Sequence, residues 1–264
     1  MTQYKLIALD VDGTLLTDDH QLTPATKDAL NRVRQLGAHI VLCTGRSPSI
    51  TMPIMEELGL EGLMITHNGA ATVDVSNHRV LHRYSFAWEE VQPVLDYCRR
   101  EGIHFDLNTE FHLYVEELSE KALETYRKYG LEPTKVDDIA AVGHTFLKST
   151  LAAPPVKLDQ LERDWPTLGC SLNMLRSDVV FIDLMHPEAN KGNALKQLAD
   201  ILGIRREQVL AIGNYYNDID MIRFAGTGIA MGNSPEEVRQ AADDVTLSNS
   251  EDGVAAALHK YVLA

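Results

Sequence analysis

The chain has 264 residues, of which 45% are hydrophobic and 23% are charged. These proportions are ordinary for a globular protein and exclude a disordered or fibrous chain. The formal net charge of −14 disfavours nucleic acids and anionic lipid surfaces as partners, because both repel an acidic protein. At this length one large or two smaller domains are expected, and we favour two.

The first residues show neither the apolar stretch nor the cleavage site of a signal peptide, and no apolar run approaches the roughly 20 residues that span a bilayer. A cytoplasmic protein without membrane contact is therefore expected. Cys43, Cys98 and Cys170 lie far apart, which argues against a disulfide framework or a cysteine-based zinc site. Cys43 falls within an apolar run and is interpreted as a core residue rather than a nucleophile.

From the N-terminus, short apolar runs alternate with a helical pattern. Strands are predicted over residues 5–9, 40–43 and 63–66, with a helix over 24–36 between the first two. Thr23 is the expected N-cap of this helix, and Gly37 is its expected stop. The strands are apolar throughout, as strands covered on both faces are, so the pattern predicts a parallel sheet with crossover helices.

The same alternation returns near the C-terminus, with strands predicted over 209–212, 228–231 and 245–247. A helix is expected to begin at Ser234, because Ser234-Pro235-Glu236-Glu237 fits a capping box with proline at the first position.

The segment 84–186 lacks this alternation and carries most of the aromatic residues. We expect an α/β fold with a doubly wound parallel-sheet (Rossmann-like) core, formed by residues 1–83 and 187–264, and an inserted α+β cap domain over 84–186.

The motif Asp10-Val11-Asp12-Gly13-Thr14 follows the first predicted strand and carries the strongest functional signal. The carboxyl ends of parallel strands are where open α/β folds bind ligands. A carboxylate in this place can attack phosphorus and form an acyl phosphate, which is the role expected of Asp10. Asp12 can protonate the leaving oxygen and then activate water. A calcium-binding turn is the alternative, but no spaced acidic residues follow.

Three further segments place polar groups at strand or helix ends. Thr44, Gly45 and Arg46 follow the strand over 40–43 and can hold phosphoryl oxygens, although threonine and glycine also end strands for geometric reasons alone. Lys191 opens a predicted helix, where a positive charge adds to a site that favours anions. Asn214 and Asp218 follow the strand over 209–212 and, with Asp10 and the Asp12 carbonyl, offer the hard oxygen ligands that Mg²⁺ prefers.

Taken together and in this order, the four segments resemble the haloacid dehalogenase-like phosphatases, most closely the Cof-type members with a large α/β cap. The resemblance covers the whole chain. It implies Asp10 and Asp12 as the catalytic aspartates, Thr44 and Lys191 as phosphate-site residues, and a core strand order of 3-2-1-4-5. It also implies a Mg²⁺-dependent phosphatase of sugar phosphates and other small phosphorylated metabolites.

The resemblance further implies that Asn68 lies near the substrate and that Asn217 touches the phosphate. The chain departs from the family pattern at Asn214, where family members usually have a metal-binding aspartate. An amide oxygen can ligate Mg²⁺ but brings no negative charge, so weakened metal binding is expected, with Asp218 as partial compensation.

The cap is expected to set specificity, and its candidate contacts are His104, Asp106, Asn108, Asn173 and Arg176. Two rival functions remain open. A mutase or a carbon–halogen hydrolase shares the fold, but Asp12 favours a phosphate substrate because a dehalogenase has no alkoxide to protonate. A catalytically weakened phosphate- or nucleotide-binding regulator is supported only by Asn214.

Overall fold

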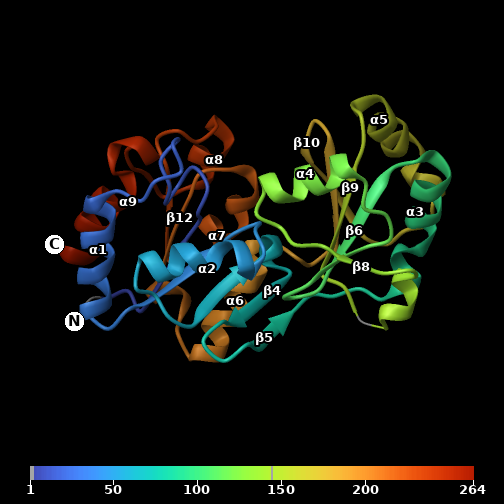
Figure 1. Cartoon of the computed structure of the whole chain (residues 1–264). Helices are drawn as coiled ribbons and strands as arrows, with labels where there is room; N and C mark the ends of the chain where they lie inside the picture. The colour runs from blue at the N-terminus through green and yellow to red at the C-terminus, as the bar shows by residue number, and fades with distance from the viewer. Residues whose placement is uncertain (1–2, 144) are drawn as a thin grey trace. The chain divides into compact units, whose positions relative to one another are not determined.

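The computed structural model describes residues 3–143 and 145–264 and divides into two compact units (Figure 1). Met1–Arg83 and Asn190–Ala264 form the first, which we call the catalytic unit, and Tyr84–Ala189 form the second, which we call the cap unit. Among the described residues, no helix is long and apolar enough to cross a membrane.

The catalytic unit is built on an eight-stranded sheet of order β14-β13-β12-β1-β2-β3-β4-β5. Six strands run parallel: β1 (Leu6–Leu9), β2 (His39–Cys43), β3 (Leu63–Thr66), β12 (Val209–Gly213), β13 (Thr227–Ala230) and β14 (Asp244–Val245). An antiparallel edge is added by β4 (Ala71–Asp74) and β5 (Arg79–Arg83). The expected α/β class and the 3-2-1-4-5 order of β3, β2, β1, β12 and β13 are confirmed.

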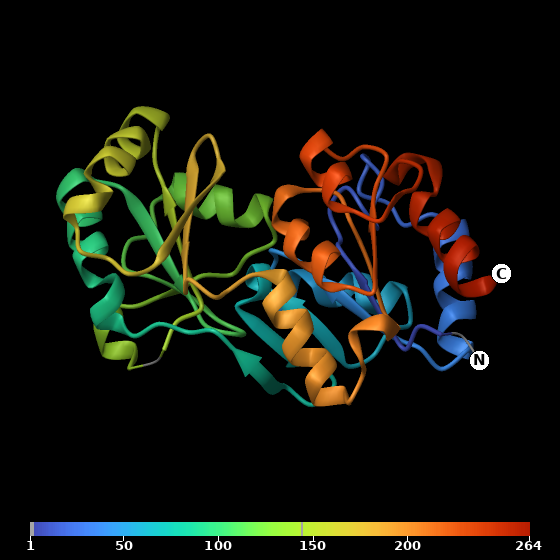
Figure 2. The same cartoon turned by 180° about the vertical axis from the view of Figure 1, so that it is seen from behind.

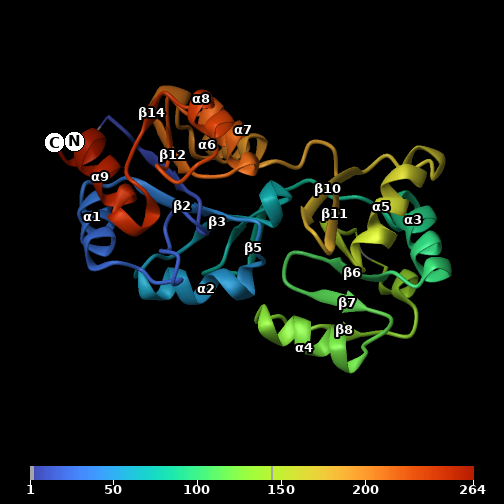
Figure 3. The same ribbon diagram turned by 90° about the horizontal axis from the view of Figure 1, so that it is seen from above.

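Helices cover both faces of this sheet, as its apolar strands require. Figure 3 shows α6 (Lys191–Leu202), α7 (Ile219–Phe224) and α8 (Glu236–Ala241) on one side, and α1 (Pro24–Gln35) and α2 (Pro48–Glu57) on the other. Leu6 and Ala8 of β1 pack with Leu195 and Leu198 of α6. Because side chains alternate along a strand, Ile7 and Leu9 are buried on the opposite face.

Residues next to α1 determine where this helix begins and ends. Thr23 is the N-cap, and its side chain accepts a hydrogen bond from the Thr26 backbone N–H. At the other end, Gly37 takes a φ of 84°, which glycine adopts without steric cost, and the chain turns towards β2.

The expected helix start at Ser234 is wrong. Helix α8 begins at Glu236 with Pro235 as its N-cap, and the Ser234 hydroxyl accepts no capping hydrogen bond. The Ser234 backbone N–H instead donates to the Met231 carbonyl, so this residue belongs to the turn after β13. The helix has only six residues, and the turn displaces its start by two positions.

The cap unit contains a six-stranded sheet of order β10-β11-β9-β6-β7-β8. Its strands are β6 (His104–Asn108), β7 (Leu113–Val115), β8 (Thr134–Lys135), β9 (Lys148–Ala152), β10 (Asn173–Asp178) and β11 (Phe181–Met185). Figure 2 shows α3 (Trp88–Glu101) and α5 (Pro155–Asp164) along the same side of this sheet, where they bury Leu107, Leu151 and Ile182. Helix α4 (Glu120–Lys128) packs Tyr126 against Leu113 and Val115 of β7.

Leu195→Ala should lower the free energy of unfolding of the catalytic unit by about 2–5 kcal/mol, because Leu195 is fully buried against β1 and its removal leaves a cavity. Denaturant unfolding measures this change. Ile201→Ala on the same helix is the control, since Ile201 is 49% exposed and its loss should change the free energy by no more than about 0.5 kcal/mol. Equal effects of the two substitutions would contradict this packing of α6.

Candidate active site

Polar side chains gather where the central parallel strands end. Asp10 follows β1, Thr44 follows β2, and Asn214 follows β12. These three strands are neighbours and run in the same direction, so their carboxyl ends meet at one edge of the sheet. Residues 200 positions apart in the sequence therefore lie within hydrogen-bond distance, as Thr14 and Asn214 do at 3.2 Å.

Lys191 connects two carboxylates at this edge. It is the first residue of α6, where Asn190 caps the helix by accepting a hydrogen bond from the Asn193 N–H. The Lys191 Nζ lies 2.6 Å from Asp10 Oδ1 and 2.7 Å from Asp218 Oδ1. The lysine and Asp218 side chains are fully buried, and the Asp10 side chain is 8% exposed. A buried charge of this kind is costly unless it is paired, and here one ammonium serves two carboxylates.

The electrostatics of this group favour a charged lysine beside an easily protonated aspartate. Burial and the neighbouring Asp218 carboxylate raise the pKa of Asp10 to about 7, while Lys191 opposes the shift. Burial also disfavours the charged form of Lys191, but Asp10 and Asp218 outweigh it and raise the pKa of the lysine. Lys191 therefore remains a cation. A further positive charge near Asp10 would favour the ionised form of the Asp10 carboxylate.

Asp218 has both oxygens engaged by the chain. Its Oδ2 accepts hydrogen bonds from the Asn214 and Tyr215 backbone N–H groups, each at 2.9 Å, and its Oδ1 faces Lys191. The carboxylate thus fixes the loop after β12 and orients the lysine. This arrangement differs from the ligand role expected of Asp218, since a fully buried, fully bonded carboxylate has no oxygen turned to solvent.

Asp12 pairs with Arg46 in a bidentate ion pair. Arg46 Nε donates to Asp12 Oδ2 at 2.9 Å, and Arg46 Nη2 donates to Asp12 Oδ1 at 2.5 Å. The Asp12 side chain is 47% exposed and the Arg46 side chain 27% exposed, so solvent and small solutes reach both. The guanidinium expected to contact phosphate is, in this structure, turned to the aspartate.

The remaining predicted residues lie close together at the ends of β2 and β3. Thr44 is buried, and its Oγ1 accepts a hydrogen bond from the Arg46 N–H at 3.1 Å. Asn217 Nδ2 donates to Asn68 Oδ1 at 2.9 Å. Asn68 takes a left-handed φ of 54°, and a Cβ on residue 45 would lie 2.8 Å from its Oδ1, so a larger residue in place of Gly45 would have to displace the Asn68 amide.

The Asn214 side chain lies where a metal ligand was expected. In the amide orientation that satisfies its neighbours, Nδ2 donates to Asp12 O at 3.0 Å, to Asp10 Oδ2 at 3.1 Å and to Thr14 Oγ1 at 3.2 Å. Gly13 makes this approach possible, because it has a φ of 74° and a Cβ there would collide with the Asn214 amide.

The acceptor oxygens that surround the Asn214 side chain could together hold a divalent cation. Asp10 Oδ2 and the Asp12 carbonyl oxygen both face a partly positive amide group, which marks a point where two acceptors favour positive charge. Turned by half a rotation, the Asn214 amide would present its oxygen to the same point. Carboxylate, carbonyl and amide oxygens are suitable Mg²⁺ ligands, and Mg²⁺ usually keeps several waters. Across residues 3–143 and 145–264, no cluster of three or more His, Cys, Asp or Glu side chains forms a metal site, so this mixed set is the candidate.

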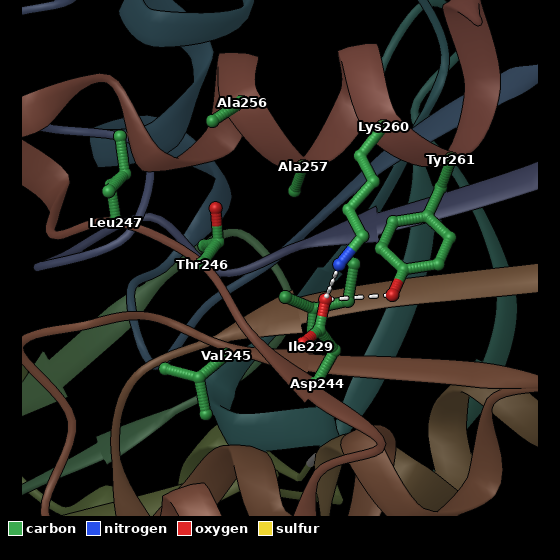
Figure 4. Close-up of a pocket in the computed structure, with 9 residues that line it drawn as sticks. All are labelled: Ile229, Asp244, Val245, Thr246, Leu247, Ala256, Ala257, Lys260 and Tyr261. Atoms are coloured by element: carbon green, nitrogen blue, oxygen red, sulfur yellow. Dashed lines mark hydrogen bonds and ion pairs between the residues drawn. The ribbon is translucent and has the colours of Figure 1, made fainter.

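A separate hollow of about 240 Å³ lies between β14 and α9 (Gly253–Leu258) in the catalytic unit (Figure 4). Asp244 lies in it and accepts hydrogen bonds from Lys260 Nζ and Tyr261 OH, both at 2.7 Å. None of the predicted site residues lines this hollow. Its charged groups satisfy one another, and we assign it no part in the chemistry.

Comparison with known sequences identifies the family. A family model described as haloacid dehalogenase-like hydrolase matches residues 7–258. YxeH of Bacillus subtilis (strain 168) is 36% identical over 274 residues, with 99% of each chain covered. From the same organism, phosphatase YwpJ is 31% identical, with 95% of this chain and 97% of YwpJ covered. The 5-amino-6-(5-phospho-D-ribitylamino)uracil phosphatase YcsE is 30% identical, with 98% of this chain and 96% of YcsE covered.

Solved structures agree with the sequence matches. A crystal structure of a haloacid dehalogenase-like hydrolase from Bacteroides thetaiotaomicron superposes with a TM-score of 0.86 at 30% identity, covering 97% of this chain and 99% of that chain. The subclass IIB sugar phosphatase BT4131 has the same fold, with a TM-score of 0.81 at 24% identity and coverage of 98% and 100%. The fold and the aspartate-bearing strand end are thus those of a hydrolase with a doubly wound, Rossmann-like core. The chain belongs to the haloacid dehalogenase-like hydrolases, of the Cof type, and it is a phosphatase.

The sequence prediction missed one residue that supports this edge. Asn233 follows β13, and its Nδ2 donates to the Gly13 carbonyl at 2.8 Å. Its Oδ1 also accepts a hydrogen bond from the Asn249 N–H at 3.2 Å. The signal was available, because Asn233 comes after a predicted strand end, as Asn214 does.

Lys191→Met should destabilise the catalytic unit by about 3–5 kcal/mol at neutral pH, because it leaves two buried carboxylates without their cation. Burial already raises the folded-state pKa of Asp10 above its unfolded value, and loss of the lysine that opposes this shift raises that pKa further. The remaining stability is therefore present at low pH and lost as the pH rises, so the deficit should be larger at about pH 8 than at about pH 5. Thermal unfolding measures it. Lys196→Met, at an exposed position of α6, is the control, and a pH-independent deficit would contradict the argument.

Asn214→Asp should strengthen Mg²⁺ binding by about 10- to 100-fold, because it supplies the negative charge that the amide lacks. Without metal the same substitution should lower the melting temperature, since the carboxylate replaces the hydrogen-bond donor to Asp10 and repels it. Calorimetric Mg²⁺ titration and thermal unfolding with and without metal measure the two effects. Asn31→Asp on the exposed surface of α1 is the control for added charge. Unchanged or weaker Mg²⁺ binding would refute the account of Asn214.

Proposed function

We propose that the protein is a Mg²⁺-dependent phosphatase of small phosphorylated metabolites, sugar phosphates among them, that acts through an aspartyl-phosphate on Asp10. The observation that carries the proposal is the Asp10 carboxylate at the end of β1, held 2.6 Å from a buried, charged Lys191. A carboxylate fixed beside a cation is placed to meet an anionic phosphoryl group, which a solvent-exposed aspartate would repel.

In the first step one Asp10 oxygen attacks phosphorus, and the bond from phosphorus to the leaving oxygen breaks. Asp12 supplies the proton that the leaving alkoxide takes up. In the second step water attacks the phosphorus of the aspartyl-phosphate, Asp12 accepts a proton from that water, and inorganic phosphate leaves with Asp10 restored.

Between turnovers, Arg46 is proposed to hold Asp12 in an ion pair. Both carboxylate oxygens of Asp12 accept hydrogen bonds from Arg46 in this ion pair, and an ionised aspartate is the form that accepts a proton from water. The first step needs the protonated form, so we propose that Arg46 leaves Asp12 and turns to the substrate phosphate when substrate binds. The partial exposure of both side chains leaves room for that exchange.

The phosphoryl group is proposed to lie among Thr44, Gly45, Asn217 and Lys191. Thr44 has a hydroxyl proton to donate, because its Oγ1 acts as acceptor towards Arg46 N–H. Asn217 is oriented by Asn68, which accepts one of its two amide protons. Asp218 is proposed to support Lys191 and the loop after β12 rather than to ligate metal.

Mg²⁺ is proposed to be held by Asp10, the Asp12 carbonyl and Asn214 in its rotated amide orientation. When bound, the ion would offset phosphate charge and keep Asp10 ionised, since nearby positive charge lowers a carboxyl pKa. The substrate class is supported by the related phosphatase YcsE, whose named substrate carries its phosphate on a ribityl chain. Specificity is proposed to lie in the cap over residues 84–186.

Asp10→Asn should reduce Mg²⁺-dependent phosphate release from an aryl phosphate by at least about 10³-fold, because it removes the attacking oxygen. Colorimetric phosphate detection across a Mg²⁺ titration measures this. Asp19→Asn, an exposed aspartate on the following loop, is the matched control and should retain full activity.

Two results would contradict the proposal. Turnover that survives in Asp10→Asn would exclude Asp10 as the nucleophile, and turnover independent of Mg²⁺ would exclude the metal role. The alternative of a weakened phosphate-binding regulator predicts saturable binding of phosphorylated ligands by the unmodified protein with no phosphate released at any Mg²⁺ concentration.

A further inference from the structure

Two asparagines from the C-terminal part of the catalytic unit hold the turn that carries Asp12. Asn233 Nδ2 donates to the Gly13 carbonyl at 2.8 Å, and Asn249 Nδ2 donates to the Leu16 carbonyl at 3.0 Å. The two asparagines are themselves joined, because the Asn249 backbone N–H donates to Asn233 Oδ1 at 3.2 Å. We call Asn233 and Asn249 the asparagine clamp.

The turn needs support from outside because it contains a flexible residue. It closes on the Val11 carbonyl, which accepts hydrogen bonds at 3.0 Å from two later backbone N–H groups. Gly13 lies inside the turn with a φ of 74°, and a glycine adopts many other conformations at little steric cost. The hydrogen bond from Asn233 to the Gly13 carbonyl therefore selects one conformation directly after Asp12.

Asn249 is the buried half of the clamp, with an exposed fraction of only 5%. Its Nδ2 donates to Asp18 Oδ1 at 3.0 Å as well as to the Leu16 carbonyl, so both amide protons bind the segment that follows Asp12. Its own backbone position is fixed by Ser248, whose Oγ donates to Glu251 Oε2 at 2.6 Å. The clamp is thus a rigid support for the turn.

The clamp is also tied to the parallel sheet. Asn233 belongs to the loop after β13, and Asn249 belongs to the loop after β14. The Gly232 N–H donates to the Leu247 carbonyl at 3.0 Å, and a Cβ on residue 232 would lie 2.9 Å from the backbone nitrogen of Ser248. These two loops therefore pack directly against each other, and the turn after β1 is held by two strand ends of the same sheet.

The proposed mechanism makes this support matter for Asp12. Arg46 holds the Asp12 carboxylate in the structure, but it is proposed to turn to the phosphate when substrate binds. The Asn214 amide, which donates to the Asp12 carbonyl, is proposed to rotate when Mg²⁺ binds. Both contacts are therefore lost in the loaded site. The clamp uses neither Arg46 nor Asn214, so its hydrogen bonds remain.

We propose that Asn233 and Asn249 are positioning residues for Asp12, which keep its carboxyl group within reach of the leaving oxygen and of the attacking water. The inference rests on the proposed function, because the clamp has no chemistry of its own. A general acid or base acts only within hydrogen-bond reach of the proton that it transfers. Loss of the clamp therefore slows the step in which Asp12 activates water, whereas the attack of Asp10 on an ester with a good leaving group continues.

Single-turnover kinetics with p-nitrophenyl phosphate, Mg²⁺ and excess enzyme test this role. Release of p-nitrophenol reports the first step, and the later release of inorganic phosphate reports hydrolysis of the aspartyl-phosphate. Asn249→Ala should slow phosphate release by about 10- to 100-fold, while p-nitrophenol release should stay within about threefold. Asn77→Ala is the matched control, because it removes an amide that donates to Asp74 in an exposed turn, and it should change neither rate.

The same measurement separates positioning from a general structural role. A distorted or partly unfolded protein loses active sites or slows both steps, so equal slowing of the two steps, or an unchanged phosphate step, would overturn the inference. Asn249→Ala leaves a buried carbonyl without its donor, and its melting temperature is therefore measured as well. Asn233→Ala guards against misfolding because the Asn233 side chain is exposed. It should keep its melting temperature and slow phosphate release by about 3- to 10-fold, and an unchanged rate there would also overturn the inference.

Asp12→Asn distinguishes failure of the clamp from failure of the proposed function. This variant should slow phosphate release more than either clamp variant and leave p-nitrophenol release within about threefold. If it slowed both steps equally or neither, the role of Asp12 in the proposed function would be wrong, and the inference would be overturned with it. If Asp12→Asn slowed phosphate release alone and the clamp variants did not, the inference alone would be overturned.

Discussion

One buried ammonium organises the catalytic unit. Lys191 joins Asp10 at the end of β1 to Asp218 after β12, and neither carboxylate could be buried at this depth without a cation between them. The contact links a helix start to two strand ends that are far apart in the sequence. In the proposed mechanism the same contact keeps the Asp10 carboxylate beside a positive charge, which opposes the rise in the pKa of Asp10 that burial causes.

The buried charges of the two units differ in how completely they are hydrogen-bonded. In the catalytic unit Asp218 accepts hydrogen bonds at both oxygens and acts as a fixed support. In the cap unit Asp106 does the same, while the Asp183 Oδ1 atom lies 3.4 Å from Lys148 Nζ and accepts no hydrogen bond from a described residue. A completely hydrogen-bonded network makes its part of the structure rigid. In the hollow at Asp244 the carboxylate likewise accepts hydrogen bonds from Lys260 and Tyr261.

The sequence was most informative where nearby residues alone determine the local structure, such as the end of a strand or of a helix. Apolar runs ending in Asp10 and Thr44 predicted the parallel sheet and its functional edge, and Thr23 with Gly37 predicted the ends of α1. Features that depend on distant pairing were not accessible. The Asp12–Arg46 ion pair joins segments 34 positions apart, and the Lys148–Asp183 pair depends on the register of β9 and β11. The wrong helix start predicted at Ser234 has a similar origin, because a capping-box pattern does not show that its serine belongs to the preceding turn.

The central claim is that Asp10 becomes phosphorylated, and trapping that intermediate tests it most directly. Asp12→Asn removes the base that activates water, whereas an aryl leaving group needs little help from an acid, so the aspartyl-phosphate should accumulate. Mass spectrometry of this variant, quenched in acid after mixing with p-nitrophenyl phosphate and Mg²⁺, should show one added phosphoryl group located on Asp10. A protein that turns over substrate but carries no phosphoryl group, or carries it on another residue, would contradict the account.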